Sequence, residues 1–252
     1  MEHITSRQNP LMVRIKKLGQ SRALRREEGV FVCEGPKLIE EALKWGACVE
    51  TLLAAEGKTP PQDLPRESRR VEVPDSLLQA VSSVETPQGL LAVCRTPSLT
   101  PPDKLSGGRY LVLDGVQDPG NLGTIWRTAD AFGADGLLLV NGCADPWSPK
   151  TIRATMGACF RLPAWEADLE TVRALLEEAD IPLYATALRA DTADVRQVDL
   201  KRAAVVIGSE GRGISKEALA LCRRTIKIPM RERCESLNAA MAAGVVLWEM
   251  CR

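Results

Sequence analysis

From about residue 110 onward, apolar residues gather in short continuous runs separated by stretches with a helical period. The runs predict strands at 110–116, 136–140, 182–187, 203–207 and 225–228. The stretches between and after them predict helices near 121–132, 148–157, 168–179, 215–222 and 236–250. Continuous apolar strands are typical of sheets buried on both faces, and alternation with helices favours parallel pairing. The pattern predicts an α/β domain whose parallel sheet is covered on both sides.

The first hundred residues predict a smaller α/β unit. Its expected strands are 30–33, 49–54 and 89–94, and its expected helices are 36–45 and 76–81. Pro36 suits the first turn of a helix, and Asp75 suits a helix cap. A stretch rich in proline and glycine, RTPSLTPPDKLSGGR, follows this unit. We therefore expect a domain at 1–96, a linker at 97–108 and a second domain at 109–252.

The net charge of the whole chain indicates no partner, but the charge of its first residues does. The 252 residues are 45% hydrophobic, which excludes a disordered chain, and 33 basic side chains balance 33 acidic ones. The first 26 residues nevertheless hold a basic excess, made of Arg7, Arg14, Lys16, Lys17, Arg22, Arg25 and Arg26. Such a segment can neutralise RNA phosphates. The alternative is a solvated, frayed terminus without a ligand.

Cysteine and histidine usage argues against a metal site. The eight cysteines form no C-x-x-C pair, and His3 is the sole histidine. Cys94 lies in the apolar run LLAVC, as expected of a buried reduced thiol in a cytoplasmic protein. The N-terminus lacks the pattern of a signal peptide, and no apolar run reaches the roughly 18–20 residues of a membrane span. We expect a cytoplasmic protein with neither metal nor membrane partner.

A first polar cluster, DPGNLGTIWRTADAFG, follows the first strand of the larger domain. Asn121 comes after a proline–glycine turn and is expected to cap the next helix. Leu122 and Ile125 share the apolar face of that helix, whereas Arg127 lies off it. Ends of parallel strands are common ligand sites, so Asn121 and Arg127 are candidates for a functional role. The alternative is a simple cap beside an ion-paired arginine.

A second cluster, VVIGSEGRGIS, reads as a strand followed by a glycine loop. Gly208, Gly211 and Gly213 allow positive φ and close backbone approach to a ligand. The spacing fits neither a dinucleotide fingerprint nor a phosphate-binding P-loop. Glu210 would repel phosphate, which favours a neutral or cationic ligand. An ordinary strand-to-helix turn is the alternative.

A third cluster is IKIPMRERCESLNAAMAAGVVLWEM. Ser236 and Asn238 stand at the expected start of its helix, where free N–H groups gather. The strand end and stiff turn at Ile228 and Met230 could form the wall of an adenine pocket. An apolar stripe at helical spacing indicates core or dimer packing and consists of Leu237, Ala240, Met241, Gly244, Val245 and Trp248.

Taken in this order, the three clusters resemble the motifs of the SpoU (TrmH-like) branch of the SPOUT methyltransferases. Those enzymes transfer a methyl group from S-adenosylmethionine to a ribose 2′-hydroxyl of RNA. The resemblance is strong over 109–252, and 1–96 is similar, more loosely, to the ribosomal-protein-L30-like RNA-binding domain of many relatives. It implies a deep trefoil knot, which general folding rules would not predict. It also implies a homodimer with the third-cluster helix at or near the interface.

The resemblance also implies roles for individual residues. The implied cofactor-binding residues are Gly208, Glu210, Gly211, Ile228, Met230, Ser236, Leu237 and Asn238. The implied catalytic residues are Asn121, Arg127, Glu210, Ser236 and Asn238. Arg153 matches an arginine that some relatives direct at RNA phosphate, and Arg127 is either the base or a phosphate clamp. Trp126, where an aliphatic residue is usual, is interpreted as a packing variation.

We therefore expect S-adenosylmethionine-dependent methylation of an RNA ribose. Ribosomal RNA is favoured over transfer RNA because the N-terminal extension resembles that of rRNA-modifying members. Three alternatives stay open: a tRNA 2′-O-methyltransferase, a base methylase of a sister branch, and a non-catalytic RNA-binding or ribosome-associated factor. A nucleotide-binding dehydrogenase is opposed by the missing G-x-G-x-x-G.

Overall fold

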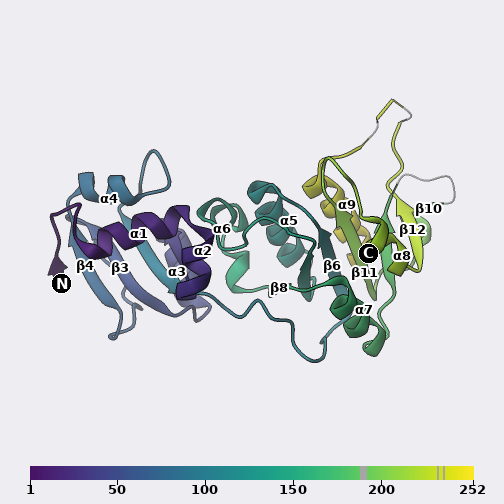
Figure 1. The fold of residues 1–252 in the computed structure, drawn as a ribbon, viewed down its shortest axis with the longest axis horizontal. Coiled ribbons are helices and arrows are strands. Elements are labelled where there is room, and N and C mark those ends of the chain that lie inside the picture. Colours follow the sequence, from purple (N-terminus) through teal and green to yellow (C-terminus); the bar gives the residue numbers. More distant parts are fainter. Residues whose placement is uncertain (188–191, 232, 235) are drawn as a thin grey trace. The chain divides into compact units, whose positions relative to one another are not determined.

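The computed structural model describes residues 1–187, 192–231, 233–234 and 236–252, and these form two compact units. The first unit contains 1–97 together with 145–160, and the second contains 98–144 and 161–252. Figure 1 labels many of the elements of both. The sequence patterns assign 145–160 to the C-terminal domain, whereas in the structure that segment packs with the N-terminal residues.

A mixed five-stranded sheet forms the centre of the first unit, in the order β1-β4-β3-β5-β2. Its strands are β1 (Glu2–His3), β2 (Val30–Glu34), β3 (Val49–Ala55), β4 (Arg69–Val73) and β5 (Leu90–Arg95). β4 pairs in parallel with β1 and β3, whereas β5 runs antiparallel to β2 and β3. The three strands expected from the sequence are confirmed to within a residue or so. β1 is too short, and β4 (RRVEV) too polar, to form the apolar runs on which the prediction relied.

Helices α1 (Pro10–Gln20), α2 (Arg22–Glu28), α3 (Pro36–Lys44), α4 (Asp75–Val81) and α6 (Pro149–Thr155) complete the first unit. The sequence reading did not predict α1 or α2, because it weighed only their charge. The overlooked signal is the apolar spacing of Leu11, Ile15 and Leu18, all of which are buried. The predicted cap of α4 is wrong: Asp75 lies in the first turn, and the preceding proline makes no side-chain cap bond.

A parallel seven-stranded sheet forms the centre of the second unit, in the order β10-β12-β9-β11-β6-β7-β8. The strands are β6 (Arg109–Asp114), β7 (Gly136–Val140), β8 (Ala164–Glu166), β9 (Leu183–Thr186), β10 (Ala193–Asp194), β11 (Ala203–Gly208) and β12 (Arg224–Lys227). Every pairing among them is parallel, which confirms the predicted α/β sheet. β8 and β10 were missed because they are only three and two residues long.

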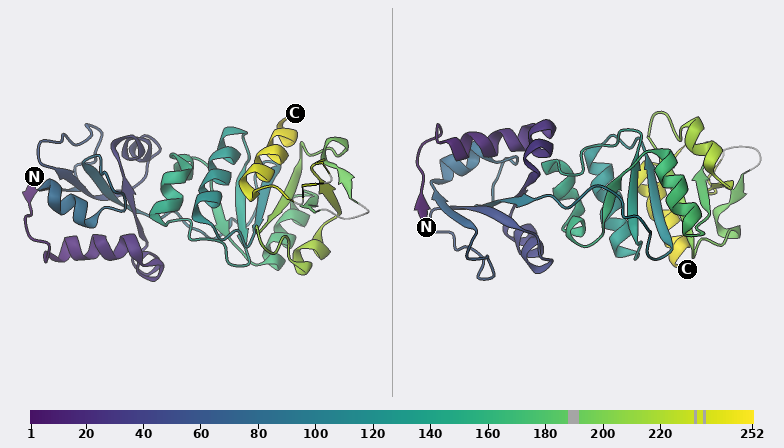
Figure 2. Two further views of the ribbon diagram at one scale, coloured as in Figure 1. Left: turned by 90° about the horizontal axis from the view of Figure 1, so that it is seen from above. Right: turned by 60° about the horizontal axis from the view of Figure 1, so that its bottom comes forward.

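Helices cover both faces of this sheet (Figure 2). α5 (Pro119–Ala131) packs beside α9 (Ala239–Cys251), and α7 (Leu169–Glu178) packs beside α8 (Lys216–Leu221). Side chains of alternate strand positions, such as Val112, Leu138 and Val206, form one core with Val172 and Leu176 of α7. This burial on both sides explains the continuous apolar runs of the strands.

Half of the apolar stripe predicted at the third-cluster helix is exposed, and Ala240 alone among its six residues is buried. Met241 is 64% exposed and Trp248 is 56% exposed, whereas Ala243, Val246 and Leu247 are buried. α9 is apolar nearly all round, so its period could not select the buried face. Core packing is therefore wrong for the three exposed residues, and the alternative of dimer packing stays a prediction. No helix within the described ranges is both long and apolar enough to cross a membrane.

Candidate active site

A pocket of about 610 Å³ opens in the second unit, where the second and third clusters meet. Its volume falls within the roughly 300–1,000 Å³ of small-molecule sites. Six of the predicted cofactor residues line it, namely Gly208, Glu210, Ile228, Met230, Ser236 and Leu237. Gly211 and Asn238 lie outside its lining. Glu235, which belongs to the third cluster, lies outside the described residues.

Other lining residues were missed by the sequence reading. Most are apolar residues of the strand ends and of the helices that follow them, namely Ala187, Ile207, Ile214, Leu219, Ile226, Ala239 and Ala242, and Thr186 adds a hydroxyl. Two more are lysines, Lys216 and Lys227. Among the described residues that line the pocket, Glu210 is the acidic one. The positions of these residues at the carboxyl ends of β9, β11 and β12 are the signal that could have found them. The result is an apolar pocket with both signs of charge at its edge.

The glycine loop after β11 is built by close backbone contact. Ser209 and Gly213 exchange backbone hydrogen bonds, at 3.1 and 2.9 Å. A Cβ on Gly208 would lie 2.3 Å from the carbonyl carbon of Gly213, and Gly213 itself has a φ of +68°. Both positions therefore require glycine, as expected. Gly211 does not: it has no positive φ, and a side chain there would meet open space.

Asn121 is not the helix cap that the sequence predicts. α5 begins two residues earlier, at Pro119, and Asp118 caps it by accepting the Asn121 N–H at 2.8 Å. The Asn121 side chain is therefore available for other contacts. Its Nδ2 donates to Glu210 Oε1, and its Oδ1 accepts from Asn238 Nδ2 at 3.1 Å.

Asn238 does cap its helix, as its position predicts. Its Oδ1 accepts the N–H groups of Ala240 and Met241, at 2.9 and 3.2 Å. The oxygen of this amide holds the start of α9 while its nitrogen reaches Asn121. Glu210, Asn121 and Asn238 thus form a hydrogen-bonded chain that joins all three sequence clusters at the pocket.

Arg127 stands exposed on α5. Within the described part of the chain its guanidinium has no hydrogen bond or ion pair, so no such bond joins it to the Glu210–Asn121–Asn238 chain. The adjacent Trp126 is fully buried and donates its Nε1–H to the carbonyl of Leu162 at 2.9 Å. The tryptophan is core packing, as expected, and Arg127 offers a permanent charge to a ligand.

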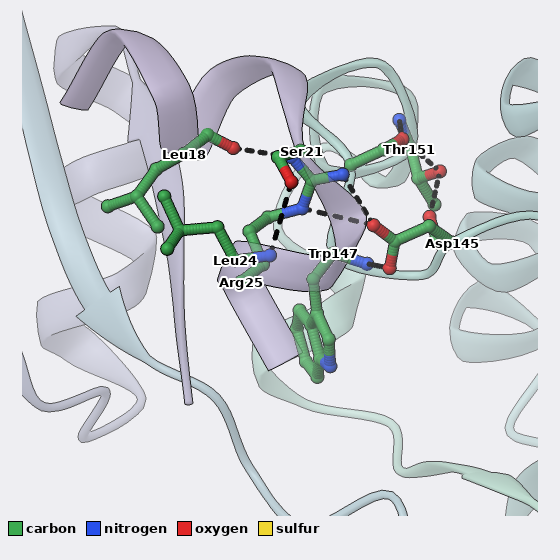
Figure 3. Close-up of polar contacts among 8 residues, drawn as sticks. Leu18, Ser21, Leu24, Arg25, Asp145, Trp147 and Thr151 are labelled. Atoms are coloured by element: carbon green, nitrogen blue, oxygen red, sulfur yellow. Dashed lines mark hydrogen bonds and ion pairs between the residues drawn. The ribbon is translucent and has the colours of Figure 1, made fainter. Parts of the chain in front are cut away.

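The basic residues proposed for RNA binding fall into two groups. Arg7, Lys16, Lys17, Arg22 and Arg26 are exposed. Arg25 is 5% exposed, and its Nε and Nη2 donate to Asp145 Oδ2 at 3.0 and 2.6 Å (Figure 3). Its Nη1 also donates to the Leu18 carbonyl. The prediction for Arg25 is wrong, because the side chain is buried and each of its guanidinium nitrogens already donates within the first unit.

Two further arginines of the first unit already use part of their guanidinium group in contacts within that unit. Arg14 forms an ion pair with Glu28, with Nε 2.6 Å from Oε2. Arg153, on α6, donates to the hydroxyl of Ser83 at 2.6 Å. Arg153 therefore belongs to the first unit and takes no part in the pocket. Their predicted contacts with RNA stay predictions.

Burial disfavours thiol chemistry at two positions of the second unit. Burial, with a smaller contribution from the Asp114 carboxylate, raises the pKa of Cys222 to about 12. Burial raises the pKa of Cys143 to about 11. Both thiols stay protonated at neutral pH and are poor nucleophiles. All eight cysteines are unbridged thiols, and Cys94 is buried as predicted.

Comparison with known proteins identifies families for both parts of the chain. Residues 108–248 match the SpoU rRNA Methylase family, and residues 9–92 match the MRM3-like substrate binding domain. The chain is 33% identical to 23S rRNA (guanosine(2553)-2′-O)-methyltransferase RlmP of Bacillus subtilis, with 99% of both chains covered. It is 32% identical to 23S rRNA (uridine(2479)-2′-O)-methyltransferase of Streptomyces viridochromogenes, with 99% of this chain and 91% of that protein covered.

Solved structures agree with these matches. The AdoMet-bound rRNA methyltransferase of Sinorhizobium meliloti superimposes with a TM-score of 0.89 at 34% identity, covering 99% of this chain and 97% of that one. The SpoU methyltransferase AviRb of Streptomyces viridochromogenes, in complex with AdoMet, gives a TM-score of 0.88 at 29% identity, with 97% of each chain covered.

Proposed function

The chain belongs to the SpoU rRNA methylase family, and from this membership we propose that it transfers a methyl group from S-adenosylmethionine to a ribose 2′-hydroxyl of ribosomal RNA. The observation that carries the proposal is the hydrogen-bonded chain Glu210–Asn121–Asn238. It joins three segments far apart in sequence beside a pocket of suitable size. Relatives named as 23S rRNA 2′-O-methyltransferases support the choice of ribosomal over transfer RNA.

The pocket fits S-adenosylmethionine in size and charge. Its apolar walls, including Ile228 and Leu237, suit the adenine, and the glycine loop lets backbone atoms approach closely. Glu210 supplies a negative charge that suits the sulfonium cation, while Lys216 and Lys227 can face the carboxylate of the methionine moiety. When bound, the cofactor supplies an electrophilic methyl group, and the chain has to position the acceptor.

The acceptor hydroxyl must lose its proton near the transition state. The sole histidine, His3, lies beside Glu56 and Glu72 of the first unit and does not line the pocket, so we assign the proton to solvent water. We assign Arg127 to the substrate phosphate, since its guanidinium is exposed and unpaired among the described residues. Positive charge beside the ribose would lower the pKa of the hydroxyl. The alternative role of Arg127 as the base is opposed by the general resistance of guanidinium to deprotonation.

Ser236 and Asn238 are assigned to orienting the cofactor or the ribose. Ser236 lines the pocket, and Asn238 is fixed by the start of α9. Exact placement of reacting groups can supply much of the acceleration of a displacement reaction. The exposed basic residues of α1 and α2 would hold RNA through its backbone.

We also propose a homodimer that uses the outward face of α9. Met241 and Trp248 leave apolar surface exposed on this face, and Trp248 meets Phe132 edge-on at 5.9 Å between ring centroids. The trefoil knot and the L30-like fold of the first unit follow from family membership and stay predictions. A cytoplasmic, metal-free enzyme likewise stays a prediction.

The test is methyl transfer from radiolabelled S-adenosylmethionine to rRNA and tRNA from a strain that lacks the gene. Arg127→Ala serves as the active-site variant, and Arg223→Ala, which removes another exposed arginine of the second unit, is the matched control. We expect label at one site of rRNA that resists alkaline cleavage and disappears with Arg127→Ala alone. Label in tRNA instead would mean that the substrate is tRNA rather than rRNA. Cofactor binding without any methyl transfer would favour a non-catalytic RNA-binding factor.

A further inference from the structure

One buried carboxylate of the second unit has no part in the proposed chemistry. Asp114, the last residue of β6, is 3% exposed. Its Oδ1 accepts from Asn141 Nδ2 at 2.7 Å, and its Oδ2 accepts the backbone N–H of Ser215 at 2.7 Å. A buried carboxylate is costly unless hydrogen bonds compensate it. Within the described ranges these neutral donors, rather than a cation, supply that compensation.

These contacts fix both ends of the glycine loop. Gly208, where β11 ends, lies opposite Asp114 in the parallel pairing of β11 with β6. Ser215, where the loop ends, donates to the carboxylate of the same residue. The chain between them carries Glu210, which reaches Asn121. A shift of Ser215 would therefore move Glu210 and the lining of the pocket.

Asn141 completes the arrangement from the turn after β7. Its φ is +54°, a left-handed conformation that asparagine tolerates better than most residues. Its Nδ2 also lies 3.3 Å from the hydroxyl of Ser215, which caps α8 by accepting the Ala218 N–H at 3.2 Å. Asp114, Asn141 and Ser215, here called the Asp114 network, thus join two strand ends to the start of a helix.

We propose that Asp114 is a positioning residue for the methyl-transfer site. Through Ser215 and Asn141 it holds the 208–215 loop in the conformation that receives S-adenosylmethionine and brings Glu210 to Asn121. Asp114 touches neither ligand nor reacting atoms in this role. The proposal rests on the proposed function for the identity of the ligand, but its effect on the loop does not depend on that identity.

A pair of reciprocal substitutions tests the network. In Asp114→Asn the new amide can accept from Ser215, but its NH₂ then faces the NH₂ of Asn141. In Asn141→Asp two carboxylates face each other. The double variant restores one donor opposite one acceptor, keeps a single negative charge, and leaves Ser215 with its acceptor. Aspartate, like asparagine, also suits the left-handed backbone of the turn after β7.

Two measurements are made on the full chain: affinity for S-adenosylmethionine by calorimetry, and amide hydrogen exchange across 208–215. Each single variant should bind the cofactor about tenfold more weakly and exchange faster in the loop, since each loses one hydrogen bond of the network. The double variant should recover to within about threefold of the original protein. Turnover with saturating cofactor should also fall in the single variants, because Glu210 is displaced.

The matched control is Asp168→Asn. Asp168 also accepts a backbone N–H at a helix start, that of Thr171 at 2.7 Å, but it lies on α7 and outside the pocket lining. It should leave cofactor affinity and loop exchange unchanged.

Several results would overturn the proposal. Single variants that match the original protein in affinity and loop exchange would do so. A lowered unfolding midpoint with unchanged affinity would make Asp114 a residue of stability alone. A double variant no better than the weaker single variant would show that the pairing is not what matters. If the original protein binds no S-adenosylmethionine, the proposed function fails, while loop exchange still decides whether Asp114 holds the loop.

Discussion

Arg25 of the first unit and Arg127 of the second show how differently one side-chain type is used within this chain. Arg25 is buried, and all three of its guanidinium nitrogens donate to Asp145 or Leu18. Arg127 is exposed and lacks any partner among the described residues. The first is occupied in holding its unit together, whereas the second keeps its donors for a ligand. Satisfied donors, more than residue type or local charge, separate a structural arginine from a functional one.

The two sheets also differ in whether they bring functional side chains together. In the mixed sheet of the first unit, strand ends point in both directions, so loops with polar residues are divided between two edges. In the parallel sheet of the second unit, the carboxyl ends of all strands meet at one edge, and loops from separate parts of the sequence converge there. That convergence places Asn121, Glu210 and Asn238 within hydrogen-bonding distance.

The largest effect should come from removing the unpaired arginine. Arg127→Ala should lower turnover by roughly 10²–10³-fold, the usual loss when one group that stabilises transition-state charge is removed. Arg127→Lys keeps the charge but loses the planar fork and should recover only part of the rate. Single-turnover methyl transfer measures both variants. Near-normal turnover by Arg127→Ala would remove the proposed contrast with Arg25.

A stability effect of similar size is expected from the paired arginine. Arg25→Ala leaves Asp145 without its cation and should lower the free energy of unfolding by about 3–5 kcal/mol. Urea denaturation followed by circular dichroism measures it, with Lys16→Ala as the exposed control, expected within about 0.5 kcal/mol of the original protein. The double variant Arg25→Met, Asp145→Leu should recover much of the loss, because apolar side chains replace both charges.

A smaller effect should follow from a change on the outer face of α9. Trp248→Glu places a charge where the proposed homodimer would exclude water, and it should weaken dimerisation by at least about 2 kcal/mol. Light scattering over a dilution series gives the dissociation constant. Glu217→Ala, an exposed change on α8, should leave it unaltered. An original protein that is monomeric at every concentration would refute the proposed dimer.

The smallest effect is expected on the exposed basic surface of the first unit. Replacing both Lys16 and Lys17 with alanine should weaken RNA binding several-fold and reduce the dependence of log affinity on log salt by about one per lost phosphate contact. Affinity for S-adenosylmethionine should stay the same. Filter binding at several salt concentrations provides the measurement. An unchanged salt dependence would place the RNA on another surface of the chain.

Much of the fold could be predicted because its signals are local. Continuous apolar runs predicted five strands of the parallel sheet, and the glycine requirement at Gly208 and Gly213 was visible in the loop sequence. Short strands such as β8 and β10 escaped prediction because two or three residues carry no period. α1 was not predicted although its apolar residues have helical spacing, because the segment was interpreted from its basic residues alone.

The candidate site was predictable as a set of residues but not as an arrangement. The resemblance of the three clusters to the SpoU motifs implied Asn121, Arg127, Glu210, Ser236 and Asn238 as the catalytic set, and their catalytic roles stay predictions. Helix bounds then changed the role of Asn121 from cap to hydrogen-bond partner, because α5 begins at Pro119. Arg25 and Arg22 stand in the same basic segment, and nothing local distinguishes the buried one from the exposed one.

The sequence by itself determined the longer apolar strands and most helices of the parallel-sheet unit, the need for glycine at Gly208 and Gly213, and which polar clusters accompany that sheet. Tertiary structure alone decided which donors are satisfied. Whether Arg25 meets Asp145, or Asp114 meets Ser215, depends on contacts between residues about a hundred positions apart. Such contacts arise from packing of the whole unit, since local preferences act over a few residues, whereas a buried charge must find its partner wherever the fold places one.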